Sequence, residues 1–182
     1  PLPLARAALI EAADEADIVL AFENGDSNPM TAVVARRGST SWRLDVTGTP
    51  AHSSQLFQSE VGAGAVYEAS RILGAFYESL AGEPLLTFNP GVMLAGTDVE
   101  FDAFTAGGSA FGKNNVVAET AIVTGDLRTI SLEQLERTRA TMRFVVMQSL
   151  PRTLATITFN DGYPPLAPTD GNYRLLSMFS QV

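Results

Sequence analysis

The sequence contains no cysteine and only one histidine, His52. The absence of cysteine excludes disulfides, thiolate nucleophiles and cysteine-ligated zinc, and it leaves the redox compartment undetermined. A single histidine also excludes a self-contained metal site built from several imidazoles. His52 lies in the stretch GTPAHSSQLFQSEVGAGAV, between a strand pattern and a helical pattern. The role of one imidazole at that junction is the first question that the sequence raises.

The chain also lacks long apolar runs and an excess of basic residues. No apolar run approaches the ~20 residues that cross a bilayer, so we expect a soluble chain with no membrane partner. The net charge of -8 and the pI of about 4.6 disfavour a nucleic-acid partner, because nucleic-acid recognition normally needs a positive surface. A hydrophobic content of 46% with 18% charged residues argues against disorder.

The length of 182 residues suits one ordinary domain, or one domain with pieces of another at its ends. The sequence opens with Pro1 rather than methionine and has no signal-peptide pattern, so we expect the natural N-terminus to lie outside it. A helix is predicted over residues 4–16, followed by a short buried strand in DIVLAFENG with Glu23 at its exit. This order is typical of the edge of an α/β sheet.

Two further helices are predicted in the middle of the chain, over residues 60–80 and 131–150. The second begins with a capping box from Ser131 to Gln134 and stops before Pro151. The first is amphipathic, because six apolar residues recur at helical spacing. Its predicted buried face consists of Val61, Ala65, Ala69, Ile72, Phe76 and Leu80.

Strand patterns surround these helices. Pro90 lacks an N–H, so the strand that contains it is expected at an edge of the sheet or at a bulge. Residues 97–112 fit a loop or an irregular hairpin. The predicted strands are a hairpin over 31–47 with its turn at 37–39, and single strands over 85–95, 116–128 and 153–159.

The order of the central elements is strand, helix, strand, strand, helix, strand. It predicts an α+β ferredoxin-like two-layer sandwich, in which two helices cover one face of a four-stranded antiparallel sheet. After this unit, Pro164, Pro165 and Pro168 precede a new helical pattern, which indicates a linker that returns to another domain. Because ferredoxin-like sandwiches host many activities, the fold alone does not predict the function.

Four segments resemble, in order and spacing, motifs of the co-catalytic zinc exopeptidases and amidohydrolases. WRLDVTGTPAHSS with the helix start GAGAV resembles the strand and G-x-x-x-H-(S/A) motif of their lid, or dimerisation, domain. Upstream of this segment, DIVLAFENG resembles the family's sequence before the lid. Downstream, NNVVAETAIVTGDLR stands where the family has N-x-(I/V)-P followed by D-x-R. At the exit from the lid, the family's sequence resembles FNDGYPPLAPTDGN. The group includes glutamate carboxypeptidase, aminoacylase, acetylornithine deacetylase and succinyl-diaminopimelate desuccinylase.

The resemblance implies a domain organisation and a metal ligand. Residues 1–30 would end the first catalytic-domain segment, 31–160 would form the lid, and 161–182 would be the linker and the start of the second catalytic-domain segment. Glu23 corresponds to a carboxylate that ligates one of two zinc ions. The other zinc ligands and the general-base glutamate would lie outside this chain. We therefore expect this piece to bind no zinc on its own and to be inactive.

The resemblance also implies roles for three lid residues. His52 corresponds to the histidine that, in family dimers, reaches the partner's active site and stabilises the tetrahedral oxyanion. Asn115 and Arg128 correspond to residues that help to bind the substrate's carboxylate, which a guanidinium can meet with two hydrogen bonds. Each residue also has a simpler interpretation: a turn cap for His52, a solvated carboxylate for Glu23, a surface ion pair for Arg128, and a turn for Asn115, beside which Asn114 competes.

The resemblance thus implies that this chain is part of a dinuclear zinc metallopeptidase or amidohydrolase of the carboxypeptidase type, whose complete form would act on a peptide or an N-acyl amino acid. The lid would form a homodimer through the edge strand near residues 85–95 and the first lid helix, because unpaired strand groups can pair with a two-fold-related copy. The alternative is a non-catalytic dimerisation or ligand-binding ferredoxin-like module.

Overall fold

A computed structural model of the chain describes residues 3–22, 28 and 30–181. Contacts divide the chain into two units, Pro1–Val33 and Val34–Val182. The first unit contains the helix α1 (Pro3–Asp14), as predicted. The strand predicted after it is wrong for the residues that are described. Residues 17–22 have no strand partner among the described residues, and Ile18, Val19, Leu20 and Phe22 are exposed.

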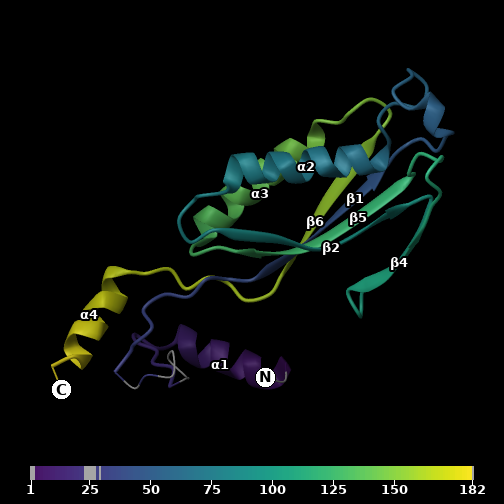
Figure 1. Ribbon diagram of the computed structural model, residues 1–182. Coiled ribbons are helices and arrows are strands. Elements are labelled where there is room, and N and C mark those ends of the chain that lie inside the picture. Colours follow the sequence, from purple (N-terminus) through teal and green to yellow (C-terminus); the bar gives the residue numbers. More distant parts are fainter. Residues whose placement is uncertain (1–2, 23–27, 29, 182) are drawn as a thin grey trace. The chain divides into compact units, whose positions relative to one another are not determined.

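The second unit is built around a four-stranded antiparallel sheet in the order β2-β5-β1-β6. Helices α2 and α3 contact each other and lie on one face of this sheet (Figure 1). The predicted ferredoxin-like α+β sandwich is therefore confirmed. Its elements are β1 (Thr40–Thr47), α2 (Gly64–Leu80), β2 (Thr87–Gly96), β5 (Thr120–Arg128), α3 (Leu132–Met147) and β6 (Leu154–Asp161), with the short η1 (Ser53–Gln55) after β1 and α4 (Asp170–Phe179) after β6.

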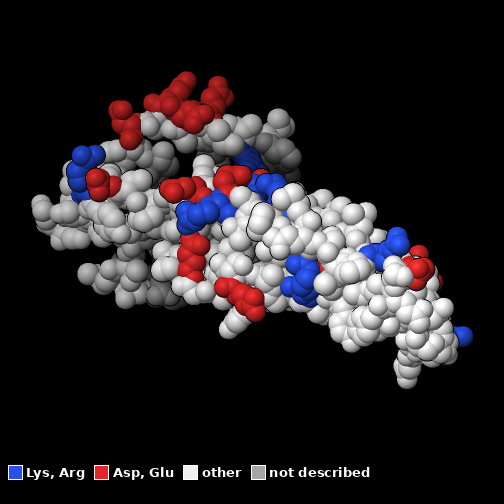
Figure 2. Space-filling view, turned by 90° about the horizontal axis from the view of Figure 1, so that it is seen from above, with Lys and Arg blue, Asp and Glu red and all other residues white. Residues whose placement is uncertain are grey.

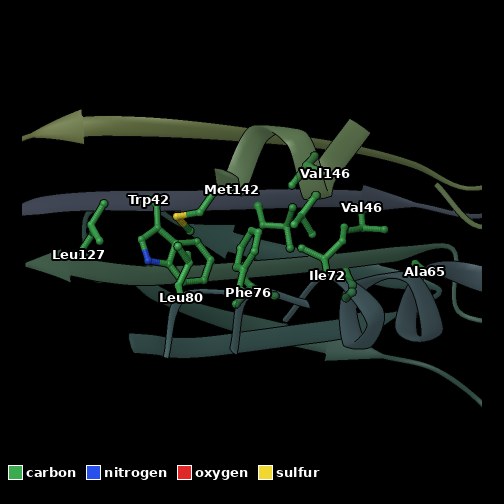
Figure 3. Packing of buried hydrophobic residues seen from close by; sticks show 14 of the residues in the cluster. Trp42, Val46, Ala65, Ile72, Phe76, Leu80, Leu127, Met142 and Val146 are labelled. Atoms are coloured by element: carbon green, nitrogen blue, oxygen red, sulfur yellow. The ribbon is translucent and has the colours of Figure 1, made fainter. Parts of the chain in front are cut away.

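The core lies between the sheet and the two helices (Figure 3). The six residues of the predicted helix face are all buried, but α2 begins at Gly64, so Val61 lies in the turn before the helix. Trp42, Leu44 and Val46 of β1 are buried as well. Burying one large apolar side chain of this kind contributes about 1.5–3 kcal/mol. Trp42 stands edge-on to Phe76 at 6.1 Å and lies over Gly125 of β5, where any Cβ would collide with the indole ring.

The hairpin predicted over residues 31–47 is wrong in its first half. Only Thr40–Thr47 forms a strand of the sheet, and Arg36 instead makes an isolated antiparallel bridge with Leu166. The N–H of Ser39 donates to the carbonyl of Tyr163 at 2.8 Å, in the same pair of segments. An alternating pattern shows that a segment is extended but not which segment pairs with it, and here the lead into the domain pairs with the exit from it.

The helix α3 begins as its capping pattern predicts. The Ser131 side chain accepts a hydrogen bond from the N–H of Gln134 at 3.1 Å, and the Gln134 side chain accepts one from the N–H of Ile130 at 2.9 Å. The Gln134 amide also donates to Glu83 at 2.8 Å, which lowers the pKa of that carboxyl group. The cap thus ties the start of α3 to the turn that follows α2.

A buried carboxylate holds the far end of α3. Glu68 of α2 is fully buried, accepts from the N–H of Leu150 at 3.0 Å, and receives two hydrogen bonds from Arg71 at 2.7 and 2.9 Å. Arg71 also donates to the carbonyls of Val145 and Gln148, at the C-terminal end of α3. These contacts fix the connection between α3 and β6.

The region between β2 and β5 forms a separate hairpin, β3 (Asp98–Asp102) and β4 (Gly107–Phe111). The sequence predicted either a loop or an irregular hairpin for residues 97–112, and the structure shows the hairpin. Arg43 of β1 places its guanidinium 4.8 Å from the ring of Phe101, so the hairpin lies on the sheet face opposite the helices (Figure 1). We call this face the open face; its side chains include Arg43, Asp45, Ile122, Thr124, Asp126 and Arg128.

The strand β2 lies at an edge of the sheet, as Pro90 predicts, and its register shifts between Pro90 and Val92. No helix among the described residues is long and apolar enough to cross a membrane. On the face of the molecule that Figure 2 shows, the basic side chains are scattered and most lie near acidic ones.

Candidate functional site

His52 lies where the chain leaves β1, in the exposed loop that leads into η1 and α2. Its backbone is extended, with φ -66° and ψ 140°, and it caps the N-terminus of η1. The loop after it is held by the α3–β6 connection, because Arg152 Nε donates to the carbonyl of Ser59 at 2.8 Å and the N–H of Ala63 donates to Pro151 at 3.2 Å. We call this end of the sheet the histidine end.

The hydrogen bonds of His52 fix which ring nitrogen carries the proton. Its Nδ1 accepts a hydrogen bond from the N–H of Ser54 at 3.2 Å and lies 2.8 Å from the Ser54 hydroxyl. A backbone N–H can only donate, so Nδ1 of the neutral ring is the unprotonated nitrogen. The proton therefore sits on Nε2, which leaves His52 with an N–H that can donate to a ligand. The turn-cap interpretation and the donor role are thus compatible, since they use different nitrogens.

Asn115 lies beside His52, although 62 residues separate them in the sequence. The carbonyl of Asn115 accepts from the N–H of Ser53 at 2.9 Å, and His52 forms an isolated antiparallel bridge with Val116. The backbone of Asn115 thus holds the loop, while its exposed side-chain amide makes no hydrogen bond with other described residues. The pairing of these two segments follows from the sheet, because β1 leads into His52 and its neighbour β5 follows Asn115.

A hollow of about 290 Å³ adjoins this pair of segments. Apolar side chains form most of its wall, and Lys113 is the one charged side chain among the described residues that line it. Ser53 and Asn114 lie at the same hollow, each directly before or after a residue of the predicted site in the sequence. The hollow thus lies beside the two predicted site residues, but neither His52 nor Asn115 lines it.

Arg128 lies at the opposite end of the sheet, which we call the linker end. It is the last residue of β5 and pairs with Thr87, whereas the histidine end begins where Thr47 pairs with Thr120. Eight residues of β1 separate the two ends, which corresponds to about 25 Å. His52 and Arg128 of one chain are therefore too far apart to touch one small ligand.

The environment of Arg128 combines an ion pair with the segments that lead into and out of the domain. Its Nε donates to Asp126 at 2.6 Å, so the two side chains share the open face. Both are more than 40% exposed, and the ion pair uses Nε alone. The next residue, Thr129, accepts from the N–H of Gly38 at 2.7 Å. A guanidinium placed in this way can bind a further carboxylate through its Nη groups.

The proposed metal ligand Glu23 lies outside the described residues, so the prediction for it stays a prediction. Among the residues that the structure describes, no group of three His, Cys, Asp or Glu side chains could hold a metal ion. Sequence reasoning also missed Ser54, which sets the tautomer of His52. Its signal was the second serine of HSS, because a residue two positions after an extended residue can donate its N–H back to the earlier side chain.

An antiparallel sheet in the order β2-β5-β1-β6 with two helices on one face defines the chain as a ferredoxin-like α+β domain. Residues 34–154, well over half of the chain, match the family described as the peptidase dimerisation domain. The chain therefore belongs to the peptidase dimerisation domain family, and the predicted relationship to such a domain is confirmed. No curated protein matches the chain at a significant level.

Solved structures of several hydrolases share the fold. A tripeptidase from Staphylococcus aureus matches with 19% identity and a TM-score of 0.59, over 78% of this chain and 33% of that chain. An aminopeptidase from Bacillus cereus matches with 17% identity and a TM-score of 0.56, over 79% of this chain and 34% of that chain. An amidase of the hydantoinase/carbamoylase family from Burkholderia phymatum matches with 13% identity and a TM-score of 0.59, over 82% of this chain and 35% of that chain. At these identities the likeness shows the fold, and this chain spans about a third of those proteins.

The tautomer of His52 can be read directly, because the chain has no other histidine to confuse the spectrum. Long-range ¹H–¹⁵N correlation NMR of the neutral ring is expected to show an unprotonated Nδ1 and a protonated Nε2. Ser54→Pro removes the donating N–H and is expected to shift the ring toward a mixture of tautomers, whereas Ser54→Ala keeps that N–H. A protonated Nδ1 in the unaltered protein would contradict the assignment.

Proposed function

We propose that the protein to which this chain belongs is a dinuclear zinc metallopeptidase or amidohydrolase of the carboxypeptidase type, and that this chain supplies its lid. The observation that carries the proposal is the joined pair of His52 and Asn115 at one end of a peptidase dimerisation domain, with the Nδ1 of His52 already occupied. In that arrangement the Nε2–H of His52 can donate to a ligand. The side-chain amide of Asn115 lies nearby, because the backbone of Asn115 is hydrogen-bonded to the loop of His52.

The chemistry of this pair suits the hydrolysis of an amide. When the carbonyl carbon is attacked, its oxygen becomes an anion, and Nε2–H of His52 would donate a hydrogen bond to it. The Asn115 amide would hydrogen-bond to the same substrate, since the loop that carries it is bonded to the loop of His52. Arg128 would hold the substrate's carboxylate through its Nη groups.

The separation of His52 from Arg128 supports roles for the two residues in different active sites of a homodimer. We propose that His52 and Asn115 act in the active site of the partner subunit, and that Arg128 acts in the active site of its own chain. In support, Arg128 lies at the linker end, where the segments around Gly38 and Tyr163 lead into and out of the domain. Each active site would then need both subunits.

The part of the chain that the structure describes contains no complete zinc site. Zinc belongs to the proposal for the complete protein, in which Glu23 and ligands from outside this chain would hold two ions. A substrate of the complete protein would be a peptide or an N-acyl amino acid, because Arg128 suits a carboxylate and the tripeptidase and amidase named above share the fold.

Metal content and hydrolysis of the full-length protein test this function. We expect two zinc ions per subunit, activity toward N-acyl amino acids or dipeptides, loss of activity with a chelator and recovery with zinc. The 182-residue chain alone should bind no zinc stoichiometrically at micromolar concentration. Tight stoichiometric zinc binding by that chain, or a metal-free active full-length protein, would count against the proposal.

Dimerisation without catalysis is a second candidate function of this piece, and it is supported by the edge strand β2. Met93 of β2 pairs with Val123, whose side chain is buried in the core, so Met93 lies on the same face of the sheet. Met93 is nevertheless 42% exposed, and Tyr77 of α2 is 70% exposed. Pro90 and the bulge beside it disturb the first half of β2, so the regular residues 92–96 are the ones suited to pair with a second copy. Sedimentation equilibrium of the chain should show a dimer, and a monomer at high concentration would contradict this interface.

A further inference from the structure

A second guanidinium lies beside Arg128 at the linker end. Nη1 of Arg37 donates to the hydroxyl of Thr87 at 3.0 Å. Thr87 is directly opposite Arg128 in the pairing of β2 with β5, so these two side chains leave the same face of the sheet. The Cβ atoms of such opposite residues are about 4.5–5.5 Å apart. Arg37 and Arg128 therefore reach the same part of the open face, from two different segments of the chain.

The segment that carries Arg37 is fixed to the end of β5. The N–H of Gly38 donates to the carbonyl of Thr129 at 2.7 Å, and the hydroxyl of Ser39 donates to Asp126 at 3.5 Å. The two residues that follow Arg37 are thus bonded to the two ends of the short stretch 126–129, at whose centre Arg128 lies. The fold itself places the Arg37 side chain at this position.

Arg128 alone is a weak receptor for a carboxylate. Its charge is balanced by Asp126, which accepts from its Nε at 2.6 Å, so a substrate carboxylate bound there would leave an excess negative charge. Among the described residues, the Arg37 guanidinium is hydrogen-bonded to the neutral hydroxyl of Thr87 and to no carboxylate. The charge of Arg37 is therefore available to balance that of one substrate carboxylate.

We propose that Arg37 is a further substrate-binding residue, which holds the substrate's carboxylate together with Arg128. This inference rests on the proposed function, because it takes Arg128 as a carboxylate-binding group. A carboxylate has two oxygens, and each guanidinium has Nη groups that can donate to one of them. The charges of both arginines, Asp126 and one carboxylate cancel, whereas a neutral amide at that end of the substrate would leave a positive charge unbalanced. The two arginines thus select a free carboxylate over its amide.

The test compares two substrates of the full-length enzyme that share the scissile bond: an N-acyl amino acid, and the same compound with its carboxylate converted to a primary amide. Arg37→Ala is expected to raise KM for the free acid about 10–100-fold, because a hydrogen bond to a charged group is lost, and to leave kcat nearly unchanged. KM for the amide should stay within about twofold. Arg37→Lys keeps the charge without the planar fork and should give an intermediate KM for the free acid.

Arg143→Ala is the matched control, because it removes the same charge from an exposed arginine of α3, on the other side of the sheet. It should change neither KM. A second variant tests the charge balance itself. In Arg37→Ala/Asp126→Asn, the Arg128 guanidinium has lost the carboxylate that neutralised it, so KM for the free acid should return most of the way to the wild-type value. A KM as high as that of Arg37→Ala alone would overturn the shared binding of the carboxylate.

The outcomes separate this inference from the function on which it rests. A wild-type enzyme that hydrolyses neither compound overturns the proposed function, and this inference with it. An active enzyme in which Arg37→Ala leaves KM for the free acid unchanged, or raises KM for the acid and the amide equally, overturns only the role of Arg37.

Discussion

Replacing His52 with alanine in the full-length enzyme is expected to lower kcat by about 10²–10³-fold, because the loss of one oxyanion donor costs about this much. Zinc content and the dimer should be unchanged, since Ser54 of the same loop is the one residue of the described chain to which the ring is hydrogen-bonded. Arg128→Ala is expected instead to raise KM for substrates with a free carboxylate. Unchanged turnover in His52→Ala would contradict the oxyanion role.

A mixture of these two variants tests the division of the site between subunits. In a heterodimer of one His52→Ala subunit and one Arg128→Ala subunit, one active site loses both residues and the other keeps both. Random re-association of equal amounts should therefore restore about a quarter of the wild-type activity. If His52 and Arg128 of one chain served the same active site, every site of the heterodimer would lack one of them.

The matched control is a mixture of His52→Ala with Asn115→Ala. The loops of these residues are hydrogen-bonded to each other at one end of the sheet, so both should serve the partner's active site. Each site of that heterodimer then lacks one of the two residues, and no recovery is expected. Recovery in this control, or its absence in the first mixture, would refute the geometric assignment.

The parts of the fold that follow from local periodicity were predictable from the sequence. The buried face of α2 from Ala65 to Leu80 and the capping box at Ser131 depend on spacing within one element, and both are confirmed. The errors concern pairing between segments. Residues 31–36 have the pattern of a strand, but among them only Arg36 forms a bridge, to Leu166. Residues 17–22 have no strand partner among the described residues. An extended pattern therefore does not show which segment, if any, pairs with it.

The candidate site shows the same division. His52, Asn115 and Arg128 could be singled out by their motifs, but no spacing indicates that two of them meet and the third lies far away. That arrangement follows from β1 and β5 being antiparallel neighbours, because the loop after β1 must then meet the segment before β5. The end of β5, with Arg128, must by the same geometry lie away from His52.

The largest expected effect on stability comes from Glu68. Glu68→Leu is expected to destabilise the domain by about 3–5 kcal/mol, because it leaves the Arg71 guanidinium without its carboxylate and the Leu150 N–H without an acceptor. Glu68→Gln keeps an acceptor of the same shape and should cost less. Glu78→Ala, at an exposed glutamate of the same helix, is the matched control and should stay within about 0.5 kcal/mol. Chemical denaturation measures all three.

A double-mutant cycle of Glu68→Leu with Arg71→Met separates two contributions to stability. One is the ion pair between Glu68 and Arg71, and the other is the hydrogen bond from the Leu150 N–H to Glu68. If the cost of Glu68→Leu comes mainly from an uncompensated Arg71, the double variant should recover part of the lost stability. Full additivity would contradict the ion pair as the cause. Since the α3–β6 connection held by Glu68 also contacts the loop after His52 through Pro151 and Arg152, both variants should loosen that loop. Faster amide hydrogen exchange at residues 53–63, measured where the domain remains folded, would show that the buried carboxylate helps to position the histidine.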